Sequence, residues 1–364
     1  MNEYLTLLDR LIATPSLSRE EHEAAALIAS FLTAKGVTDI QRLHNNIYVR
    51  AKHWDDAKPT LLLNSHIDTV KPSPAYTRDP FQPTHEQGRI YGLGSNDAGA
   101  SVVSLIAAFC HFYDQPLPFN LLLTIVGEEE VTGANGARAL FGQSPSLLPT
   151  GELFAIVGEP TGMQVAIAER GLVVLDGLAH GRSGHAARNE GINALYIALD
   201  DIDALRSYRF DRESSLLGPV KVTTTQIQAG SQHNVVPAEC RFVVDVRTTD
   251  AYTNEEVVSL LQGAVQSTLT PRSTYIRASV IDSSHPLVRV AESMNIPCYV
   301  SPTTSDMALM SFPSIKMGPG DSARSHTADE WVGEQEVLDA IDQYITFINH
   351  LSASSDPSPL LLEG

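Results

Sequence analysis

The segment Thr60-Leu61-Leu62-Leu63-Asn64-Ser65 is a short apolar run that leads directly into His66-Ile67-Asp68. It is too short for a buried helix and has the length of a buried strand. Similar runs recur at Asn120–Val126 and Leu153–Val157, and the long, alanine-rich segment Gly99–Phe112 predicts a helix. Apolar strands that alternate with helices are typical of a parallel sheet covered on both faces. The sequence therefore predicts an α/β domain built on a mostly parallel sheet flanked by helices.

The flanking sequence extends this pattern in both directions. Apolar residues recur at intervals of three and four from Glu3 to Leu32, and the proline in Thr14-Pro15-Ser16 divides this region into two predicted helices. Ala134–Phe141 predicts a helix, Ser314–Met317 a strand, and Gly333–Leu351 a closing helix. The same alternation thus opens and closes the chain.

A second domain is predicted between these parts, because the pattern changes near Glu169-Arg170-Gly171. The expected elements are strands over 173–178, 221–227, 240–247 and 275–281 and helices over 193–205 and 254–267. Their order, β-α-β-β-α-β, is that of a ferredoxin-like α+β sandwich. The predicted division is 1–171 and 284–351 for the larger domain, 172–283 for the inserted domain, and 352–364 for a disordered tail.

The composition excludes several classes of protein. The chain has 364 residues, more than one core of roughly 250–300 residues accommodates, so two domains are expected. The formal net charge of −18 argues against nucleic acid or an anionic membrane as a partner. No apolar stretch approaches the ~20 residues of a membrane span. The N-terminus lacks the features of a signal peptide, so a cytoplasmic location is expected.

Polar side chains follow the predicted strands of the larger domain where those strands end. They are His66, Asp97, Glu129, Glu159 and His326, and intervals of 31, 32 and 30 residues separate the first four. A βαβ unit has about this length of ~30 residues, and ligands bind at the carboxyl ends of parallel strands, so these groups are expected along one edge. Bare carboxylates there would repel one another, and a pair of divalent cations sharing one carboxylate is the simplest remedy. Such nitrogen and oxygen ligands suit zinc, and also manganese or cobalt.

The order of these motifs resembles that of the M20 metallopeptidases and deacylases. The resemblance rests on His66-Ile67-Asp68, Asp97, Glu128-Glu129, Glu159 and His326, and it extends over nearly the whole chain. Each motif alone is weak, because a histidine after a strand or a run of glutamates is usually structural or solvated; the conjunction in this order is specific. The resemblance implies a dinuclear catalytic domain and an inserted domain that serves as lid and dimerisation domain.

The resemblance also implies a ligand set. His66 and Glu159 would hold one ion, Glu129 and His326 the other, and Asp97 would bridge the two. The expected cofactors are two divalent metal ions, with zinc first and cobalt or manganese as the alternatives.

Two further carboxylates have implied roles at this centre. Asp68 would steady His66, and Glu128 would be the general base that moves a proton from water to the leaving nitrogen. The family often has Lys-Gly-Gly after the bridging aspartate, whereas Ala98-Gly99-Ala100 follows Asp97 in this chain. The resemblance also implies a cis peptide bond between Asp97 and Ala98.

Contacts with the substrate are implied for the inserted domain and two loops. His185, within Ser183-Gly184-His185-Ala186-Ala187, would reach the active site of the other subunit and stabilise the oxyanion, which implies a homodimer. The expected substrate-binding residues are Asn234, Arg247, Thr304, Ser305 and Arg324. Arg247 would suit a substrate carboxylate; a salt bridge at a strand edge is its alternative, and a surface role is the alternative for Arg324.

The segments Gly184–Gly191 and Gly318–Thr327 look most like those of acetylornithine-deacetylase-type members. The expected reaction is hydrolysis of the amide bond of an N-acyl amino acid in arginine biosynthesis. The expected substrates are N-acetylornithine, N-succinylornithine, or N-acetyl- or N-succinylcitrulline. The alternatives are a succinyl-diaminopimelate desuccinylase and a dipeptidase or aminopeptidase. A catalytically silent binding protein would be expected to lack the base or a ligand, and none is missing from the sequence.

Overall fold

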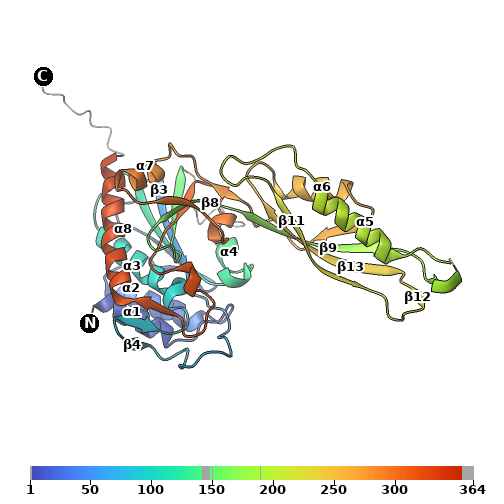
Figure 1. Ribbon diagram of the computed structural model, residues 1–364. Coiled ribbons are helices and arrows are strands. Elements are labelled where there is room, and N and C mark those ends of the chain that lie inside the picture. The colour runs from blue at the N-terminus through green and yellow to red at the C-terminus, as the bar shows by residue number, and fades with distance from the viewer. Residues whose placement is uncertain (1, 142–147, 150, 189, 355–364) are drawn as a thin grey trace, which may run out of the picture. The chain divides into compact units, whose positions relative to one another are not determined.

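The computed structural model describes residues 2–141, 148–149, 151–188 and 190–354 and divides into two compact units (Figure 1). Unit 1 comprises Met1–Ile167, Ile281–Tyr299 and Ser305–Gly364, and unit 2 comprises Ala168–Val280 and Val300–Thr304. The predicted boundaries after residues 171 and 283 lie within four residues of the main division. The short segment Val300–Thr304, which belongs to unit 2, was not part of the predicted insertion.

A nine-stranded sheet is found within the described residues, in the order β1-β2-β6-β3-β7-β17-β8-β15, with β16 paired to β8. Strands β1, β2, β3, β6, β7 and β17 lie in unit 1, whereas β15 and the ends of β8 and β16 belong to unit 2. The strands are β1 (Gln41–Leu43), β2 (Asn46–Arg50), β3 (Thr60–His66), β6 (Asn120–Val126), β7 (Leu153–Val157), β8 (Val165–Glu169), β15 (Ser279–Val280), β16 (Cys298–Ser301) and β17 (Ser314–Lys316). The central strands β6, β3, β7 and β17 run parallel to one another, whereas β2 and β8 join them antiparallel. The predicted mostly parallel sheet is thus confirmed.

Both faces of this sheet are buried, as the continuous apolar strands predict. Every residue of β3 is buried. Because successive side chains of a strand point to opposite faces, Leu61 and Leu63 enter one hydrophobic cluster and Leu62 another. Full burial of such a side chain contributes about 1.5–3 kcal/mol relative to exposure. The pattern therefore fixes the strand between two layers.

Helices form the layers on the two faces of the sheet. They are α1 (Glu3–Ile12), α2 (His22–Ala34), α3 (Ala100–Phe112), α4 (Ala137–Phe141), α7 (Pro286–Ser293) and α8 (Glu334–Ser354). The side chain of Asn2 caps the amino end of α1 by accepting a hydrogen bond from the N–H of Tyr4. Helix α8 continues to Ser354, so residues 352–354 of the predicted disordered tail are helical, and the remainder of that tail lies outside the described residues.

A small three-stranded sheet in unit 1 was not predicted. It consists of β4 (Thr84–Glu86), β5 (Arg89–Tyr91) and β18 (Trp331–Gly333), in the order β18-β5-β4. The turn between β4 and β5 places Gln87 and Gly88 at positive φ (54° and 73°), as a tight hairpin requires. This sheet joins the segment just before Asp97 to the segment just after His326.

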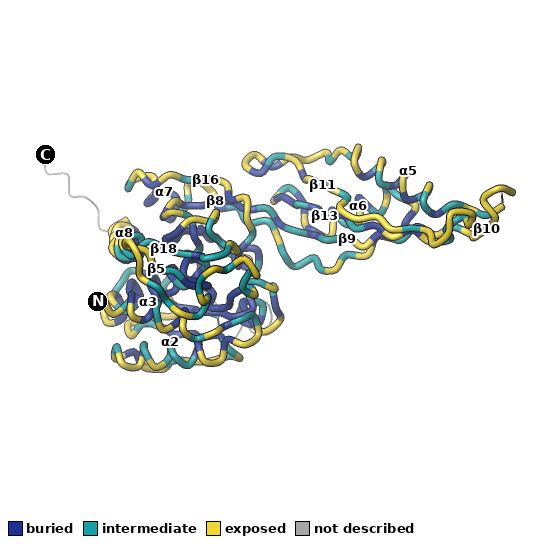
Figure 2. Tube along the Cα trace, turned by 60° about the horizontal axis from the view of Figure 1, so that its bottom comes forward, coloured by how far each residue is buried: buried dark blue, intermediate teal, exposed yellow. Residues whose placement is uncertain are grey.

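Unit 2 has the predicted β-α-β-β-α-β order. Its elements are β9 (Gly171–His180), α5 (Ala194–Ser207), β11 (Lys221–Ala229), β13 (Glu239–Thr248), α6 (Asn254–Gly263) and β14 (Thr268–Pro271), and the sheet order is β11-β13-β9-β14. One face carries Val173, Leu175 and Ala179 against Ala194 and Ala198 of α5. Buried residues alternate with less buried ones along β9 and β13. The burial colours of Figure 2 show both kinds of residue in these strands.

The last strand of the four-stranded sheet differs from the prediction. It is Thr268–Pro271 instead of 275–281, because α6 ends at Gly263 and leaves room for four residues that pair with β9. Only residues 279–280 of the predicted strand are extended in a ladder, and they pair with β8 as β15.

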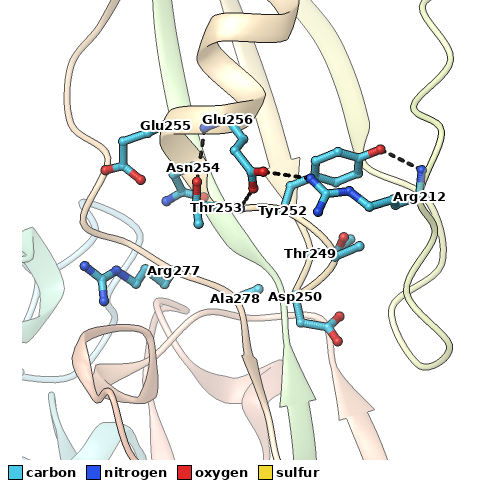
Figure 3. Close-up of a pocket in the computed structure, with 11 residues that line it drawn as sticks. Arg212, Thr249, Asp250, Tyr252, Thr253, Asn254, Glu255, Glu256, Arg277 and Ala278 are labelled. Carbon is cyan, nitrogen blue, oxygen red and sulfur yellow. Dashed lines mark hydrogen bonds and ion pairs between the residues drawn. The ribbon is translucent and has the colours of Figure 1, made fainter.

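Helix α6 begins in a capping box next to a pocket of about 560 Å³ (Figure 3). The Thr253 hydroxyl accepts from the N–H of Glu256, whose carboxylate accepts in return from the N–H of Thr253. The same carboxylate binds the Arg212 guanidinium at 2.9 Å. The polar groups at this helix end are therefore largely satisfied by one another.

Among the residues that the structure describes, no helix is both long and apolar enough to cross a membrane.

Candidate metal centre

The two carboxylate oxygens of Asp97 face two different histidines. Oδ1 lies 3.2 Å from Nε2 of His66, and Oδ2 lies 3.7 Å from Nε2 of His326. Glu159 approaches His66 at 3.8 Å, and Glu130 contacts His326 at 3.0 Å. Two groups, each with one histidine and one glutamate, thus share a single aspartate.

Strand ends and helix starts bring these side chains together. His66 is the last residue of β3, Glu130 follows β6, and Glu159 follows β7, and these three strands are parallel neighbours. Asp97 lies in the turn Ser95–Gly99 that leads into α3, and its peptide bond to Ala98 is cis, as expected. The carboxyl edge of the parallel sheet therefore carries the cluster, where the sequence placed it. Ligand atoms of His66, Asp97 and Glu130 all lie within 4.8 Å of one another.

Within the run Glu128-Glu129-Glu130, the residue that contacts His326 is Glu130, one position after the predicted ligand Glu129. Glu128 has left-handed backbone angles (φ 56°, ψ 19°) and is buried. Its carboxylate accepts hydrogen bonds from the N–H (3.2 Å) and side-chain amide (3.0 Å) of Asn135. It is therefore committed to the loop that follows. The structure brings Glu130 into contact with His326, where Glu129 was the expected ligand. Glu129 is close enough to His66 and Glu159 for their charges to affect its pKa.

Asp68 organises both sides of the cluster. One of its oxygens lies 3.5 Å from Nδ1 of His66, so it faces the ring nitrogen opposite to the one that faces Asp97. The same carboxylate accepts from the backbone N–H groups of Glu129 (2.9 Å) and Glu130 (3.1 Å). The Ser18 hydroxyl donates to it at 2.7 Å. Nδ1 of His66 lies still nearer, at 3.0 Å, to the backbone carbonyl oxygen of Asp68. Asp68 is thus in contact with His66 through main chain and side chain, and it also holds the glutamate turn.

The electrostatics of the cluster fit divalent cations. Burial raises the pKa of Glu159 to about 8, with Asp97 adding to the rise and His66 opposing it. Burial also raises the pKa of Glu129 well above its ordinary value, and that of Glu130 above its ordinary value. The protein alone therefore disfavours the charged forms of these glutamates. Metal binding requires them deprotonated, and two divalent ions would supply the missing positive charge.

The contacts of His66 with Asp68 and Asp97, in contrast, favour the charged forms of the histidine and of Asp97. Burial alone would lower the pKa of His66, but its bonds to Asp68 and Asp97 raise it well above its ordinary value. Burial would raise the pKa of Asp97, but the contact with His66 lowers it. Histidine nitrogen with carboxylate oxygen is a donor set for zinc, manganese or cobalt.

Two predicted substrate-binding arginines are engaged in ion pairs. Arg247 forms a two-pronged bond with Asp245, at 2.8 and 3.1 Å. Arg324 binds Glu336 in the same way, at 2.7 and 3.1 Å, and its guanidinium lies 3.7 Å from the Trp331 ring centroid. Arg247 thus forms a salt bridge, the kind of contact that the sequence left open for it, whereas Arg324 is partly buried in an ion pair and not at the free surface.

The remaining predicted contacts are divided between the units. His185 and Asn234 are exposed in unit 2, where β10 (Gly184–His185) pairs with β12 (Val235–Val236). Thr304 belongs to unit 2 and its hydroxyl donates to the carbonyl of Arg170 at 3.4 Å. Ser305 belongs to unit 1, is buried, and accepts from the N–H of Met307. The sequence analysis missed Glu130, which stands within the run that it singled out.

Comparison with known proteins agrees with this geometry. Residues 62–350 match peptidase family M20/M25/M40. A succinyl-diaminopimelate desuccinylase of Cereibacter sphaeroides is 30% identical over 270 residues, 69% of each chain. A probable carboxypeptidase of Aspergillus clavatus is 31% identical over 79% of this chain and 64% of its own length. An acetylornithine deacetylase of Buchnera aphidicola is 25% identical over 77% of each.

Solved structures share the fold. The aminopeptidase PepT of Bacillus cereus superimposes with a TM-score of 0.77 at 18% identity, covering 96% of this chain and 98% of its own. A dinuclear metal-binding M20 peptidase of Bacillus subtilis gives a TM-score of 0.73 at 17% identity, covering 97% and 98%. The chain therefore belongs to peptidase family M20/M25/M40 and is a metal-dependent hydrolase of amide bonds.

Proposed function

We propose that this enzyme removes the acyl group from an N-acyl amino acid with two divalent metal ions, zinc being the expected metal. His66 and Glu159 would hold one ion, His326 and Glu130 the other, and Asp97 would bridge them. The observation that carries the proposal is the division of the Asp97 oxygens between His66 and His326, at 3.2 and 3.7 Å.

When bound, such a pair of ions supplies a water of lowered pKa and polarises the scissile carbonyl. Glu129 would take the proton from that water and pass it to the leaving nitrogen. Its raised pKa suits both steps, because a carboxyl group that titrates nearer to neutrality can accept a proton and then release it. Asp68 keeps Glu129 in place through its backbone N–H. His66 stays oriented by the same carboxylate.

A homodimer through unit 2 is part of the proposal. Strand β11 stands at the edge of its sheet, and among the described residues it pairs with β13 alone. Apolar side chains are exposed nearby, Ile227 on β11 at 47% and Tyr196 and Leu199 on α5 at 65% and 48%. An open strand edge and apolar surface favour pairing with a second copy. His185, exposed in unit 2, would then serve the oxyanion in the partner's active site.

For the substrate we propose an N-acylated ornithine or citrulline, acetyl or succinyl, in arginine biosynthesis. The segments around His185 and His326 and the Buchnera relative support this assignment. The second candidate is N-succinyl-diaminopimelate, favoured by the desuccinylase relative at 30% identity. A peptidase is the third, favoured by the fungal carboxypeptidase.

Amine release from a panel of substrates tests the proposal. The panel contains N-acetyl and N-succinyl forms of ornithine, citrulline and diaminopimelate and a set of dipeptides, each with zinc, cobalt or chelator. We expect an ornithine or citrulline derivative to be preferred and its hydrolysis to be lost with chelator. Preference for succinyl-diaminopimelate or a dipeptide would reject the arginine assignment, and turnover that survives complete metal removal would reject the metal-dependent chemistry.

A further inference from the structure

Glu330 is a buried carboxylate that binds the backbone of the segment carrying Asp97. It is 2% exposed. Its oxygens accept from the N–H groups of Gly94 (3.0 Å), Asn96 (2.9 Å) and Asp97 (2.9 Å). An N–H group buried without a partner costs about 1–3 kcal/mol, and both the charged and the protonated carboxyl group can accept these bonds. One side chain therefore fixes the turn that presents Asp97.

This turn has a conformation that its own sequence does not enforce. Gly94 has a positive φ of 75°, and Asp97 has non-helical angles (φ −119°, ψ 95°) within the short helical turn before α3. The N–H groups held by Glu330 thus fall where no regular helix or strand pairs them. Without that acceptor the carboxylate of Asp97 would lose its fixed direction.

The same residue is joined to His326. Glu330 follows His326 by four residues and precedes β18, which pairs with β5 next to Gly92. The Glu330 carbonyl accepts from the N–H of Gly92 at 2.9 Å. Main chain and side chain of one residue thus tie the His326 segment to the Asp97 segment. These two segments carry His326 and Asp97, whose side chains lie 3.7 Å apart.

We propose that Glu330 is a positioning residue that sets the separation of Asp97 and His326 and so completes the site of the second metal ion. The inference rests on the proposed function of this cluster. Glu330 does not touch the reacting atoms; it acts on His326 and Asp97 through the backbone. The first site, of His66 and Glu159, has its own anchor in Asp68 and should depend on Glu330 less.

Asp329 offers a matched control. It is also a carboxylate that accepts from two backbone N–H groups, of Thr77 (2.9 Å) and Arg78 (3.0 Å), and from the Thr77 hydroxyl. The loop that it holds carries no proposed ligand. Asp329→Asn and Glu330→Gln therefore make the same chemical change one residue apart: each replaces one carboxylate oxygen by an NH2 group and removes the charge.

The experiment titrates metal-free full-length protein with Co²⁺ and follows stoichiometry, affinity and the visible spectrum, with thermal unfolding alongside. For Glu330→Gln we expect the second ion to bind at least about tenfold more weakly, by analogy with the 10–100-fold cost of losing outer-shell partners. The first ion shares the bridging Asp97 but also has His66 and Glu159, so its affinity should fall less. The kcat should fall more than KM changes, and excess metal should restore part of it. Asp329→Asn should bind both ions as the wild type does.

Two wild-type-like binding events in Glu330→Gln, with only a lowered Tm that matches Asp329→Asn, would overturn the proposal. If Glu330→Gln does not fold, Glu330→Asp, which keeps the charge with a shorter reach, is titrated instead and is held to the same two outcomes. Failure of the proposed function has a different signature, because the wild type itself would then bind fewer than two ions or lose none of its turnover in chelator.

Discussion

Two carboxylates that brace the cluster of unit 1 are buried and hydrogen-bonded, whereas two proposed site residues of unit 2 are exposed. Asp68 and Glu330 are buried carboxylates that accept from the backbone of ligand-bearing turns. His185 and Asn234 of unit 2 are exposed. The metal cluster of unit 1 is thus braced by buried carboxylates of its own chain. In the proposed homodimer, the partner chain would supply surroundings for the exposed His185.

The largest expected effect separates two adjacent glutamates of unit 1. Glu129→Gln should lower kcat by about 10²–10⁴, the usual contribution of a general acid–base group, while metal content stays near two ions per chain. Glu128→Gln should retain most of its activity, because the Asn135 amide still has an acceptor. Steady-state kinetics and metal analysis of both variants provide the check. The reverse ranking would restore Glu128 as the base.

The second effect tests whether unit 2 acts across the dimer. His185→Ala should lower kcat by about 10²–10³, as loss of an oxyanion donor does. Mixing His185→Ala chains with Glu129→Gln chains, each nearly inactive alone, should recover roughly a quarter of wild-type activity. Half of the randomly formed dimers are mixed, and each mixed dimer has one complete site. If activity does not return in verified mixed dimers, His185 acts within its own chain.

A third, smaller effect is expected on metal affinity when the carboxylate of Asp68 in unit 1 is replaced by an amide. Asp68→Asn weakens the hold on His66 and on the N–H groups of Glu129 and Glu130. Metal affinity should fall about 10–100-fold, with activity regained at high metal concentration. Calorimetric titration of the metal-free protein measures this. Wild-type affinity for both ions would show that the ligands are held without Asp68.

The smallest effect concerns the stability of unit 1 alone. His85 bridges Asp9 of α1 (2.9 Å) and Glu334 of α8 (2.8 Å), and although partial burial lowers its pKa, these carboxylates raise it overall. A raised folded pKa gives stabilisation that is complete below the unfolded pKa of about 6.5 and is lost as pH rises through the folded value. We expect no more than about 1 kcal/mol, since the pair is partly exposed. Thermal unfolding from pH 5.5 to 8.5 should show this slope in the wild type and not in His85→Gln.

Sequence reasoning succeeded where burial is two-sided. The strands at Asn120–Val126 and Leu153–Val157 match their predicted limits, because every residue of each is buried and the apolar pattern therefore starts and stops with the strand. The strand Thr268–Pro271 was missed because it is short and only Leu269 is buried. The cluster of strand-end ligands was predicted for the same reason as the sheet itself, since parallel strands share one carboxyl edge.

Which glutamate of the run 128–130 contacts His326 could not be predicted from the burial pattern. It depends on the left-handed backbone at Glu128 and on Asn135, whose two hydrogen bonds engage the Glu128 carboxylate. Neither contact has a signal in residue spacing. Arg247 and Arg324 show the same limit, because each partner, Asp245 and Glu336, is known only once the backbone is folded.

The proposed ligands of the metal centre come from positions 66, 97, 130, 159 and 326, so they span most of unit 1. Their assembly requires the contacts of longest sequence separation in the unit, and such contacts are the slowest to form. Metal uptake should accordingly be among the last events as a newly made chain folds. A chain that ends before residue 326 could form most of the sheet and still hold no second ion, so bound metal would report that synthesis of the catalytic unit is complete.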